Sequence, residues 1–209
     1  LRSLRTGEKK YDICFIVRVW AGIYDEDQIE HNIKILEAIS RVDCRKFLFA
    51  YVSGGDYGKI GRRLDKRNIP WSTTPIPLQQ LWEISAQSRL TVLRLGVFYC
   101  VPWRMTDMLA MGACPVRDRA PYTLWPRPLT ENENYLAFNL DIGPGKSVAR
   151  DEDYASIPGK IDAWLPDRSL TERISSKNRE YFDDFMDPRK LGKYIIDTVQ
   201  RKTGSTENK

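Results

Sequence analysis

Residues 101–116 read VPWRMTDMLAMGACPV and hold the clearest structural signal in the chain. Pro102 suits the first turn of a helix, because the N–H that proline lacks needs no partner there. Met105, Met108 and Leu109 recur with helical spacing and give one apolar face. Gly112 is typical of a helix end, and residues 113–116 then favour a buried strand. The stretch therefore predicts a short helix that leads into a strand.

Arg104 and Asp107 are three residues apart, so both should project from one side of this helix near its N-terminus. A helix N-terminus carries free N–H groups and partial positive charge, which suits a phosphate group. A cation in the first turn opposes the helix dipole by about 0.3–1 kcal/mol, and an anionic ligand would account for it. Arg104 would then pair with phosphate while Asp107 accepts from sugar hydroxyls. The alternative is an exposed Arg–Asp pair that contributes almost nothing to stability.

The pattern Arg-x-x-acid, small-x-Gly and x-x-Pro-Val resembles the donor-binding block in the C-terminal domain of GT-B glycosyltransferases. In that family an acidic residue on this helix commonly holds the ribose or the transferred sugar of a nucleotide-sugar. Members usually carry Glu where this chain has Asp107, which is one methylene shorter. The next residues, DRAPYTLWPRPLTENENYLAFNL (118–140), are similar to the family's loop, acidic segment and short strand. The resemblance spans residues 10–200, with motifs between residues 90 and 140.

Length and composition agree with one folded domain. The chain has 209 residues, 42% apolar and 11% aromatic, which excludes a disordered protein. A formal charge of +5 favours anionic ligands without requiring nucleic acid, which we regard as an improbable partner. No apolar run reaches the ~18 residues of a membrane span. One histidine and four cysteines without CxxC spacing argue against a zinc site, and Cys14 and Cys114 are predicted as buried core residues. We expect a cytoplasmic protein and leave contact with a membrane surface open.

The order of elements predicts an α/β fold, a doubly wound and mostly parallel Rossmann-like sheet with helices on both faces and a helical C-terminal extension. Expected strands cover residues 11–19, 46–52, 69–74, 90–95 and 113–117. Expected helices lie between them and, beyond the sheet, at about 152–165, 169–185 and 188–202. We expect a linker or disordered start over 1–10 and a Rossmann-like donor-binding domain over 11–150. Helices packed on the same domain over 151–202 and a disordered tail over 203–209 would follow.

Ligands bind such sheets at the carboxyl ends of the strands, near the point where the strand order reverses. The side chains that the sequence places there are Arg18, Trp20, Ser53, Gly54, Trp71, Thr73, Arg94 and Tyr99. Arg18, Arg94 and Arg104 are candidates to neutralise a diphosphate, and the resemblance implies this role for a basic residue just after the first strand. The resemblance also places the nucleotide base near Ser53, Gly54, Trp71 and Thr73, and Tyr99 is a candidate for stacking or hydrogen bonding. The alternatives are arginines paired with carboxylates and a simple Gly-Gly turn.

Other motifs are better explained by structure than by chemistry. The acidic triplets 25–27 and 151–153 match the DxD pattern that resembles the metal site of GT-A glycosyltransferases. Both precede helical periodicity, so we interpret them as helix caps. His31 is expected to be exposed and inert. The basic stretch 59–67 favours a solvated helix face over a nucleic-acid surface, because no aromatic residues are interleaved with it.

The resulting hypothesis is a glycosyltransferase, or its donor-binding module, that transfers a hexose or deoxyhexose from a nucleotide-diphosphate-sugar to a glycan or glycoconjugate, in carbohydrate biosynthesis. Arg104 and Asp107 would form its catalytic pair, with no cofactor and no obligatory metal. A general base is expected to come from an N-terminal domain or a partner chain, as the family resemblance implies, and the start at Leu1 suggests a piece of a longer chain. The alternative is a non-catalytic α/β module that binds nucleotides or nucleic acid.

Overall fold

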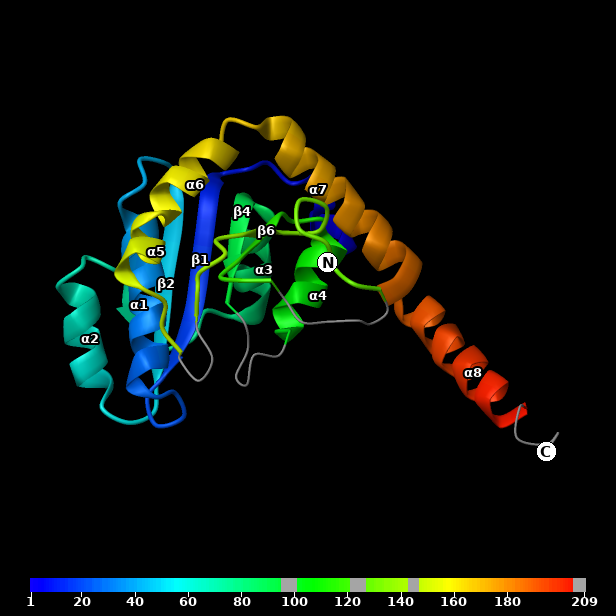
Figure 1. Ribbon diagram of the computed structural model, residues 1–209, viewed down its shortest axis with the longest axis horizontal. Helices are drawn as coiled ribbons and strands as arrows, with labels where there is room; N and C mark the ends of the chain where they lie inside the picture. The colour runs from blue at the N-terminus through cyan, green and yellow to red at the C-terminus, as the bar shows by residue number, and fades with distance from the viewer. Residues whose placement is uncertain (95–100, 121–126, 143–146, 205–209) are drawn as a thin grey trace.

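The computed structural model describes residues 1–94, 101–120, 127–142 and 147–204, and its centre is one parallel sheet (Figure 1). The strands in these residues are β1 (Tyr11–Trp20), β2 (Lys46–Ser53), β3 (Trp71–Ser72), β4 (Ser88–Leu93), β5 (Pro115–Arg117) and β6 (Leu136–Ala137). They lie in the order β3-β2-β1-β4-β5-β6, and each neighbouring pair is parallel. The predicted α/β, doubly wound, Rossmann-like sheet is thus confirmed.

Helices follow most strands. They are α1 (Glu26–Ser40), α2 (Tyr57–Asp65), α3 (Leu78–Ala86), α4 (Trp103–Met111), α5 (Asp151–Ala155), α6 (Ile157–Trp164), α7 (Arg168–Tyr181) and α8 (Pro188–Gly204). A 3-10 helix η1 (Arg2–Thr6) precedes β1, and a π-helical turn η3 (Phe182–Met186) joins α7 to α8. As predicted, Asp25 caps α1, where its carboxylate accepts from the backbone N–H of Gln28 at 2.7 Å. Gly112 ends α4 with φ +63°, in the left-handed region that favours glycine.

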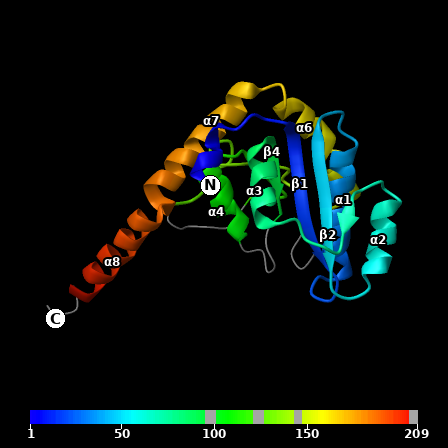
Figure 2. The same cartoon turned by 180° about the vertical axis from the view of Figure 1, so that it is seen from behind.

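The two faces of the sheet are covered by different helices. Phe15 and Val17 of β1 pack with Ile33 and other residues of α1, and α5 and α6 join this larger core. On the opposite face, Cys14 and Ile16 pack against α3, while α4 builds a neighbouring cluster (Figure 2). Full burial of each such aliphatic or aromatic side chain contributes about 1.5–3 kcal/mol to the stability of the folded protein. Cys14 and Cys114 are both buried, as predicted.

The predicted linker over residues 1–10 is wrong, because η1 is held by contacts far away in the sequence. Arg5 donates to the carbonyl of Ala110 at 2.8 Å and pairs with Asp183 at 2.7 Å. Arg2 pairs with Asp183 and Asp187, both at 2.7 Å. The hydrogen bonds from Arg5 and then Arg2 outweigh partial burial and lower the pKa of Asp183 to about 2. The order of this segment depends on partners that its own sequence does not contain.

The last helix departs from the expected packing over 188–202. In Figures 1 and 2, α8 projects away from the body of the molecule beyond η3. Tyr194, Ile195, Ile196 and Val199 on this helix are exposed. Among the described helices, none is long and apolar enough to cross a membrane.

Strand β3 is shorter than the expected 69–74. Asn68 has φ +52° and Pro70 lacks an N–H, so regular pairing starts at Trp71. The carbonyl of Pro70 still accepts from the N–H of Ala50 at 3.0 Å. The edge of the sheet therefore ends in a two-residue strand.

Candidate functional site

The strand order reverses between β1 and β4, and the two strands part before β1 ends. Their pairing stops at Phe15 with Val92, whereas β1 stays paired with β2 as far as Trp20 with Ser53. Residues 16–20 of β1 therefore lack a β4 neighbour. We call this place, between residues 16–20 and Arg94, the switch point. It lies on the carboxyl edge of the sheet, the lower edge in Figure 1, where ligands of such folds bind.

Arg104 of α4 lies at the switch point, but in a different pose from the one expected. The side chain turns inward and is partly buried, and Nη1 donates to the carbonyl of Ile16 at 2.7 Å. Arg104 thus satisfies a carbonyl at the position where β1 leaves β4. Its Nε and Nη2 are buried and have no hydrogen-bond partner among the described residues. Burial lowers the pKa of Arg104, and the charge of Asp107 opposes this effect.

Asp107 is half-buried one turn further along α4. Its Oδ2 accepts from Nε1 of Trp82 on α3 at 2.9 Å. Burial raises the pKa of Asp107, while this hydrogen bond and the charge of Arg104 lower it. Asp107 is therefore fixed by a neighbouring helix, and the alternative of a solvent-exposed Arg–Asp surface pair does not describe either residue.

Four predicted residues at the ends of β1 and β2 come together. Arg18 donates from Nε to Oγ of Ser53 at 3.0 Å, and its guanidinium lies 3.7 Å from the ring centroid of Trp20. Gly54 follows with φ +72°, and a Cβ there would lie 2.4 Å from the carbonyl oxygen of Ala21. Only glycine allows the two loops to approach so closely. The side chain of Arg18 remains exposed, so its guanidinium can still meet a ligand.

The other predicted base-binding residues are not placed in this group. Trp71 packs against α2, where a Cβ on Gly61 would lie 2.2 Å from the indole ring. Its Nε1 donates to Asp65 at 2.8 Å, which gives the side chain a structural role. Thr73 is exposed beyond β3. Tyr99 falls in 95–100 and lies outside the described residues.

Arg94 follows β4 directly and lies over the ring of Tyr24, with its Cζ 4.9 Å from the centroid. Its Nη1 is buried and lacks a hydrogen-bond partner among the described residues. A buried donor without a partner costs about 1–3 kcal/mol, so each such group requires an explanation. Arg94 and Arg104 both present this feature at the switch point.

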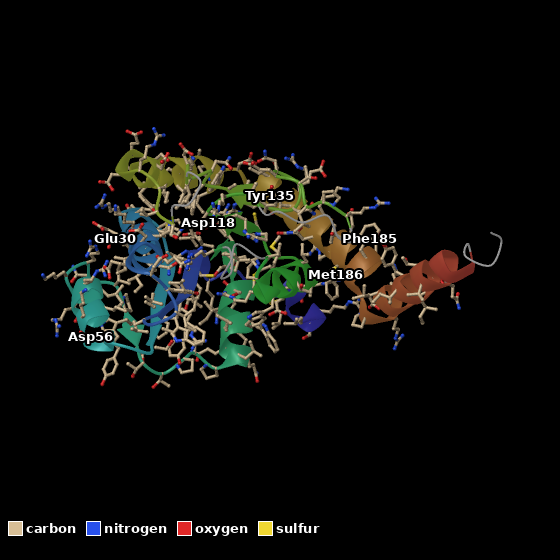
Figure 3. The ribbon with its side chains drawn as sticks, turned by 60° about the horizontal axis from the view of Figure 1, so that its bottom comes forward. Glu30, Asp56, Asp118, Tyr135, Phe185 and Met186 are labelled. Atoms are coloured by element: carbon tan, nitrogen blue, oxygen red, sulfur yellow. The ribbon has the colours of Figure 1, made fainter. Side chains whose placement is uncertain are left out.

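Sequence reasoning missed a buried polar network beside Arg94. His31 was expected to be exposed and inert, and this is wrong: it is 1% exposed. Its Nδ1 lies 2.6 Å from the hydroxyl of Tyr154, and its Nε2 lies 3.3 Å from Oδ2 of Asp118. Figure 3, which turns the carboxyl edge toward the viewer, shows Asp118 between Glu30 and Tyr135.

The charges of this network follow from its burial. Burial lowers the pKa of His31 more than the hydrogen bond and charge of Asp118 raise it. Burial opposes ionisation of Asp118 too, but His31 and the charges of Arg117 and Arg94 outweigh it, so the pKa of Asp118 is lowered. A neutral His31 beside an ionised Asp118 fits both shifts. Asp118 immediately follows the predicted strand 113–117, and this position at the carboxyl end of a strand could have identified it from the sequence as a candidate site residue.

The basic stretch 59–67 covers most of α2 and the turn after it, and two of its three arginines pair with acidic residues of α1. Arg63 pairs with Glu26 and with Glu30, and Arg67 pairs with Glu37 at 2.8 Å. These carboxylates neutralise much of the positive charge that nucleic-acid binding would require. Within the described residues, no three His, Cys, Asp or Glu side chains gather as a metal site would require.

Comparisons with known proteins place this geometry in context. No family model matches the chain, and no match is found among curated proteins. Among solved structures, TarM of S. aureus aligns with a TM-score of 0.54 and 15% identity over 91% of this chain and 35% of its own. The C-terminal domain of LpcC, a group 1 glycosyl transferase of Francisella tularensis, aligns with a TM-score of 0.51 and 12% identity, over 84% of this chain and 86% of its own. Anabaena HepE in complex with UDP aligns with a TM-score of 0.55 and 12% identity, over 90% of this chain and 49% of its own.

These matches show the fold. The chain has the fold of the C-terminal domain of GT-B glycosyltransferases, and it spans about a third of TarM and half of HepE. Identities of this size say nothing about the chemistry of individual residues.

Proposed function

We propose that this chain binds the nucleotide-sugar donor of a glycosyltransferase, with the diphosphate at the switch point. The observation that carries the proposal is the pair of arginines whose buried donors have no partner among the described residues. Those donors are Nη1 of Arg94 and both Nε and Nη2 of Arg104. An anion with several acceptor oxygens would satisfy them, and a diphosphate is such an anion. The fold of the GT-B donor-binding domain supports the same location.

In the proposed reaction, the bond between the anomeric carbon of the donor sugar and the diphosphate oxygen breaks as an acceptor hydroxyl attacks. Negative charge then grows on the leaving diphosphate. Arg94 and Arg104, with Arg18 at the open side, would stabilise that charge, and fixed cations of this kind need no reorganisation during the step. Asp107 would orient the donor by accepting hydrogen bonds from hydroxyl groups of the sugar. Its Oδ2 is held in place by Nε1 of Trp82. We propose that no metal ion is required, because the arginines supply the positive charge.

The proposal extends to the class of sugar and the acceptor. A hexose or deoxyhexose transferred to a glycan or glycoconjugate matches the family resemblance. HepE was solved with UDP, which makes UDP the first nucleotide to test. The base that deprotonates the acceptor would come from a further domain or a partner chain.

Isothermal titration calorimetry of UDP, GDP, dTDP and CDP tests the proposal directly. We expect one nucleotide to bind at micromolar concentration, with the same affinity in Mg²⁺ and in EDTA. Arg94→Gln should weaken that binding by about 1.5–3 kcal/mol, or roughly 10- to 150-fold, because it removes a charged hydrogen-bond donor. Asp107→Asn should leave binding closer to that of the wild type but reduce transfer in the complete enzyme.

Arg41→Gln is the matched control, because Arg41 is exposed and pairs with Glu37 at the opposite end of α1. It should bind the nucleotide like the wild type. Equal affinity in Arg94→Gln and the wild type would refute a diphosphate at the switch point. Tight binding of a polynucleotide with a steep salt dependence would instead favour a nucleic-acid-binding module. Against that alternative, Arg63 of α2 already pairs with Glu26 and Glu30 of α1.

A further inference from the structure

A second basic site lies at the opposite, amino-terminal edge of the sheet. A cavity of about 340 Å³ opens there between the starts of β1 and β4 and the first turns of α7. Its charged lining consists of four cations and two acids, namely Lys9, Arg45, Arg89, Arg168, Asp12 and Glu172. The cavity lies at the start of β1, whereas the switch point begins at residue 16, so roughly 13–26 Å of β1 separates Asp12 from residues 16–20.

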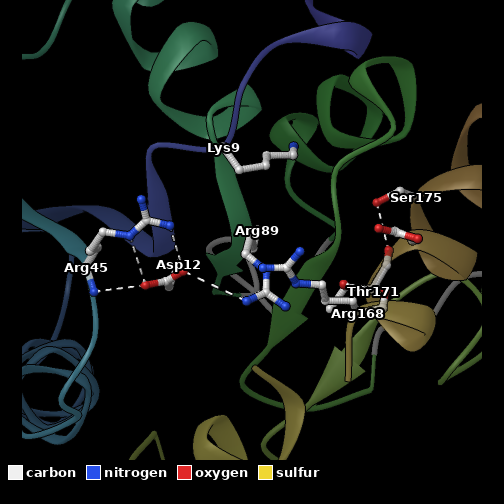
Figure 4. Close-up of a pocket in the computed structure, with 8 residues that line it drawn as sticks. Lys9, Asp12, Arg45, Arg89, Arg168, Thr171 and Ser175 are labelled. Atoms are coloured by element: carbon white, nitrogen blue, oxygen red, sulfur yellow. Dashed lines mark hydrogen bonds and ion pairs between the residues drawn. The ribbon is translucent and has the colours of Figure 1, made fainter. Parts of the chain in front are cut away.

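The two acids do not cancel the positive charge of the cavity. Asp12 accepts hydrogen bonds from Arg45 at 3.0, 3.2 and 3.3 Å and lies 3.9 Å from Arg89, so it is already engaged, as Figure 4 shows. Glu172 is exposed on α7. The six charged side chains around the cavity therefore carry a net formal charge of +2.

Lys9, Arg89 and Arg168 keep hydrogen-bond donors for a ligand. Nζ of Lys9 uses one N–H on the carbonyl of Ala86 at 2.6 Å, which leaves two. Arg89 donates to the carbonyl of Leu165, which anchors its guanidinium at the wall. Arg168 makes no hydrogen bond or ion pair through its side chain with the described residues. It stands at the first position of α7, next to the N-cap residue Asp167, whose carboxylate accepts from the N–H of Leu170 at 2.9 Å.

The partly buried Nζ of Lys9 adds a second argument. Partial burial lowers the pKa of Lys9, and the charge of Arg179 acts in the same direction. Partial burial of a charged ammonium group is unfavourable without a counter-ion. An anion in the cavity would supply that counter-ion.

We propose that this cavity binds a phosphate group of a small molecule, held by Lys9, Arg89 and Arg168. The site is separate from the proposed donor site and independent of it. Its size fits a compact phosphorylated ligand, since ligand pockets begin at about 300 Å³. A phosphate on a lipid headgroup has the same chemistry, so the experiment must separate the two sources.

The test is a titration of the ¹⁵N-labelled chain with inorganic pyrophosphate at constant ionic strength, followed residue by residue by NMR. We expect saturable shifts in the backbone amides at the start of α7 and around Lys9. Arg168→Gln and Lys9→Met should each raise the dissociation constant for these shifts at least tenfold. Arg173→Gln is the matched control, because Arg173 is also exposed on α7 but does not line the cavity.

Pyrophosphate can also reach the switch point, so its two effects must be distinguished. Shifts at residues 20–24 that disappear in Arg94→Gln would report the donor site, and those at α7 should persist in that variant. Absence of shifts at α7, or shifts unchanged in both Arg168→Gln and Lys9→Met, would overturn the proposal. Vesicles of phosphatidylcholine with phosphatidic acid form the second arm. Arg168-dependent sedimentation with them would assign the phosphate to a lipid, and its absence would assign it to a soluble molecule.

Discussion

The buried His31 makes the stability of the fold depend on pH in a predictable direction. The chain has a single histidine, so a titration near pH 6 reports this residue. Burial holds its pKa in the folded protein below the ordinary 6.5. Above pH 6.5 both the folded and the unfolded chain carry a neutral imidazole, and the full stability is present. Below that value the unfolded chain takes up a proton that the folded chain resists, so stability falls.

The size of the effect follows from the same linkage. Each pH unit below 6.5 can remove up to about 1.36 kcal/mol, until the pKa of the folded state is reached. The expected loss between about pH 7.5 and pH 5.5 is therefore up to ~1.4 kcal/mol. Asp118 does not contribute in this window, because its lowered pKa keeps it ionised, and its own stabilising effect is lost only below its unfolded pKa.

Urea unfolding, followed by tryptophan fluorescence at the two pH values, measures this loss. His31→Gln retains a polar side chain but cannot titrate, so its stability should change little over the window. The variant should also be less stable than the wild type at pH 7.5, because Tyr154 and Asp118 lose a buried partner. Equal stability of the wild type at both pH values would refute a depressed pKa for His31. A loss of the same size in His31→Gln would assign it to another group.

Two further predictions concern packing and the candidate site. Gly61→Ala should destabilise the protein by about 1–3 kcal/mol in urea unfolding, because its Cβ would lie 2.2 Å from the indole ring of Trp71. Gly159→Ala, also in a helix but with nothing within 4 Å of its Cβ, should be neutral or stabilising by up to about 1 kcal/mol. Asp107→Asn retains an acceptor for Nε1 of Trp82, so its melting temperature should fall by no more than ~4 °C. A larger fall would identify Asp107 as a mainly structural residue.

The sequence predicted the features that depend on local patterns. Periodicity and caps located the central strands and α1, and alternation of strands and helices predicted the parallel sheet. The residues that come together at the ends of β1 and β2 were also recognisable, since Arg18 lies near the end of the predicted strand 11–19 and Ser53 directly follows the predicted strand 46–52. These predictions needed no knowledge of tertiary contacts.

The features that the sequence could not predict depend on partners far away in the chain. His31 is buried against Tyr154 of α5 and Asp118 after β5, and the sequence of α1 alone does not reveal these contacts. The first residues are ordered because Arg5 finds Asp183, 178 residues later. The helical spacing of residues 101–116 predicted that Arg104 projects outward, but its guanidinium turns inward and donates to the carbonyl of Ile16.

The inward pose of Arg104 links the fold to the proposed function. Where β1 and β4 part, a backbone carbonyl loses its partner, and an unsatisfied buried carbonyl is costly. Arg104 satisfies it with Nη1 and at the same time brings two further donors to the switch point. Arg104 therefore keeps buried donors that have no partner in the described part of the chain, as Arg94 does. An anion that pairs with those donors would remove this cost, so binding of a diphosphate and stability of the fold should rise together.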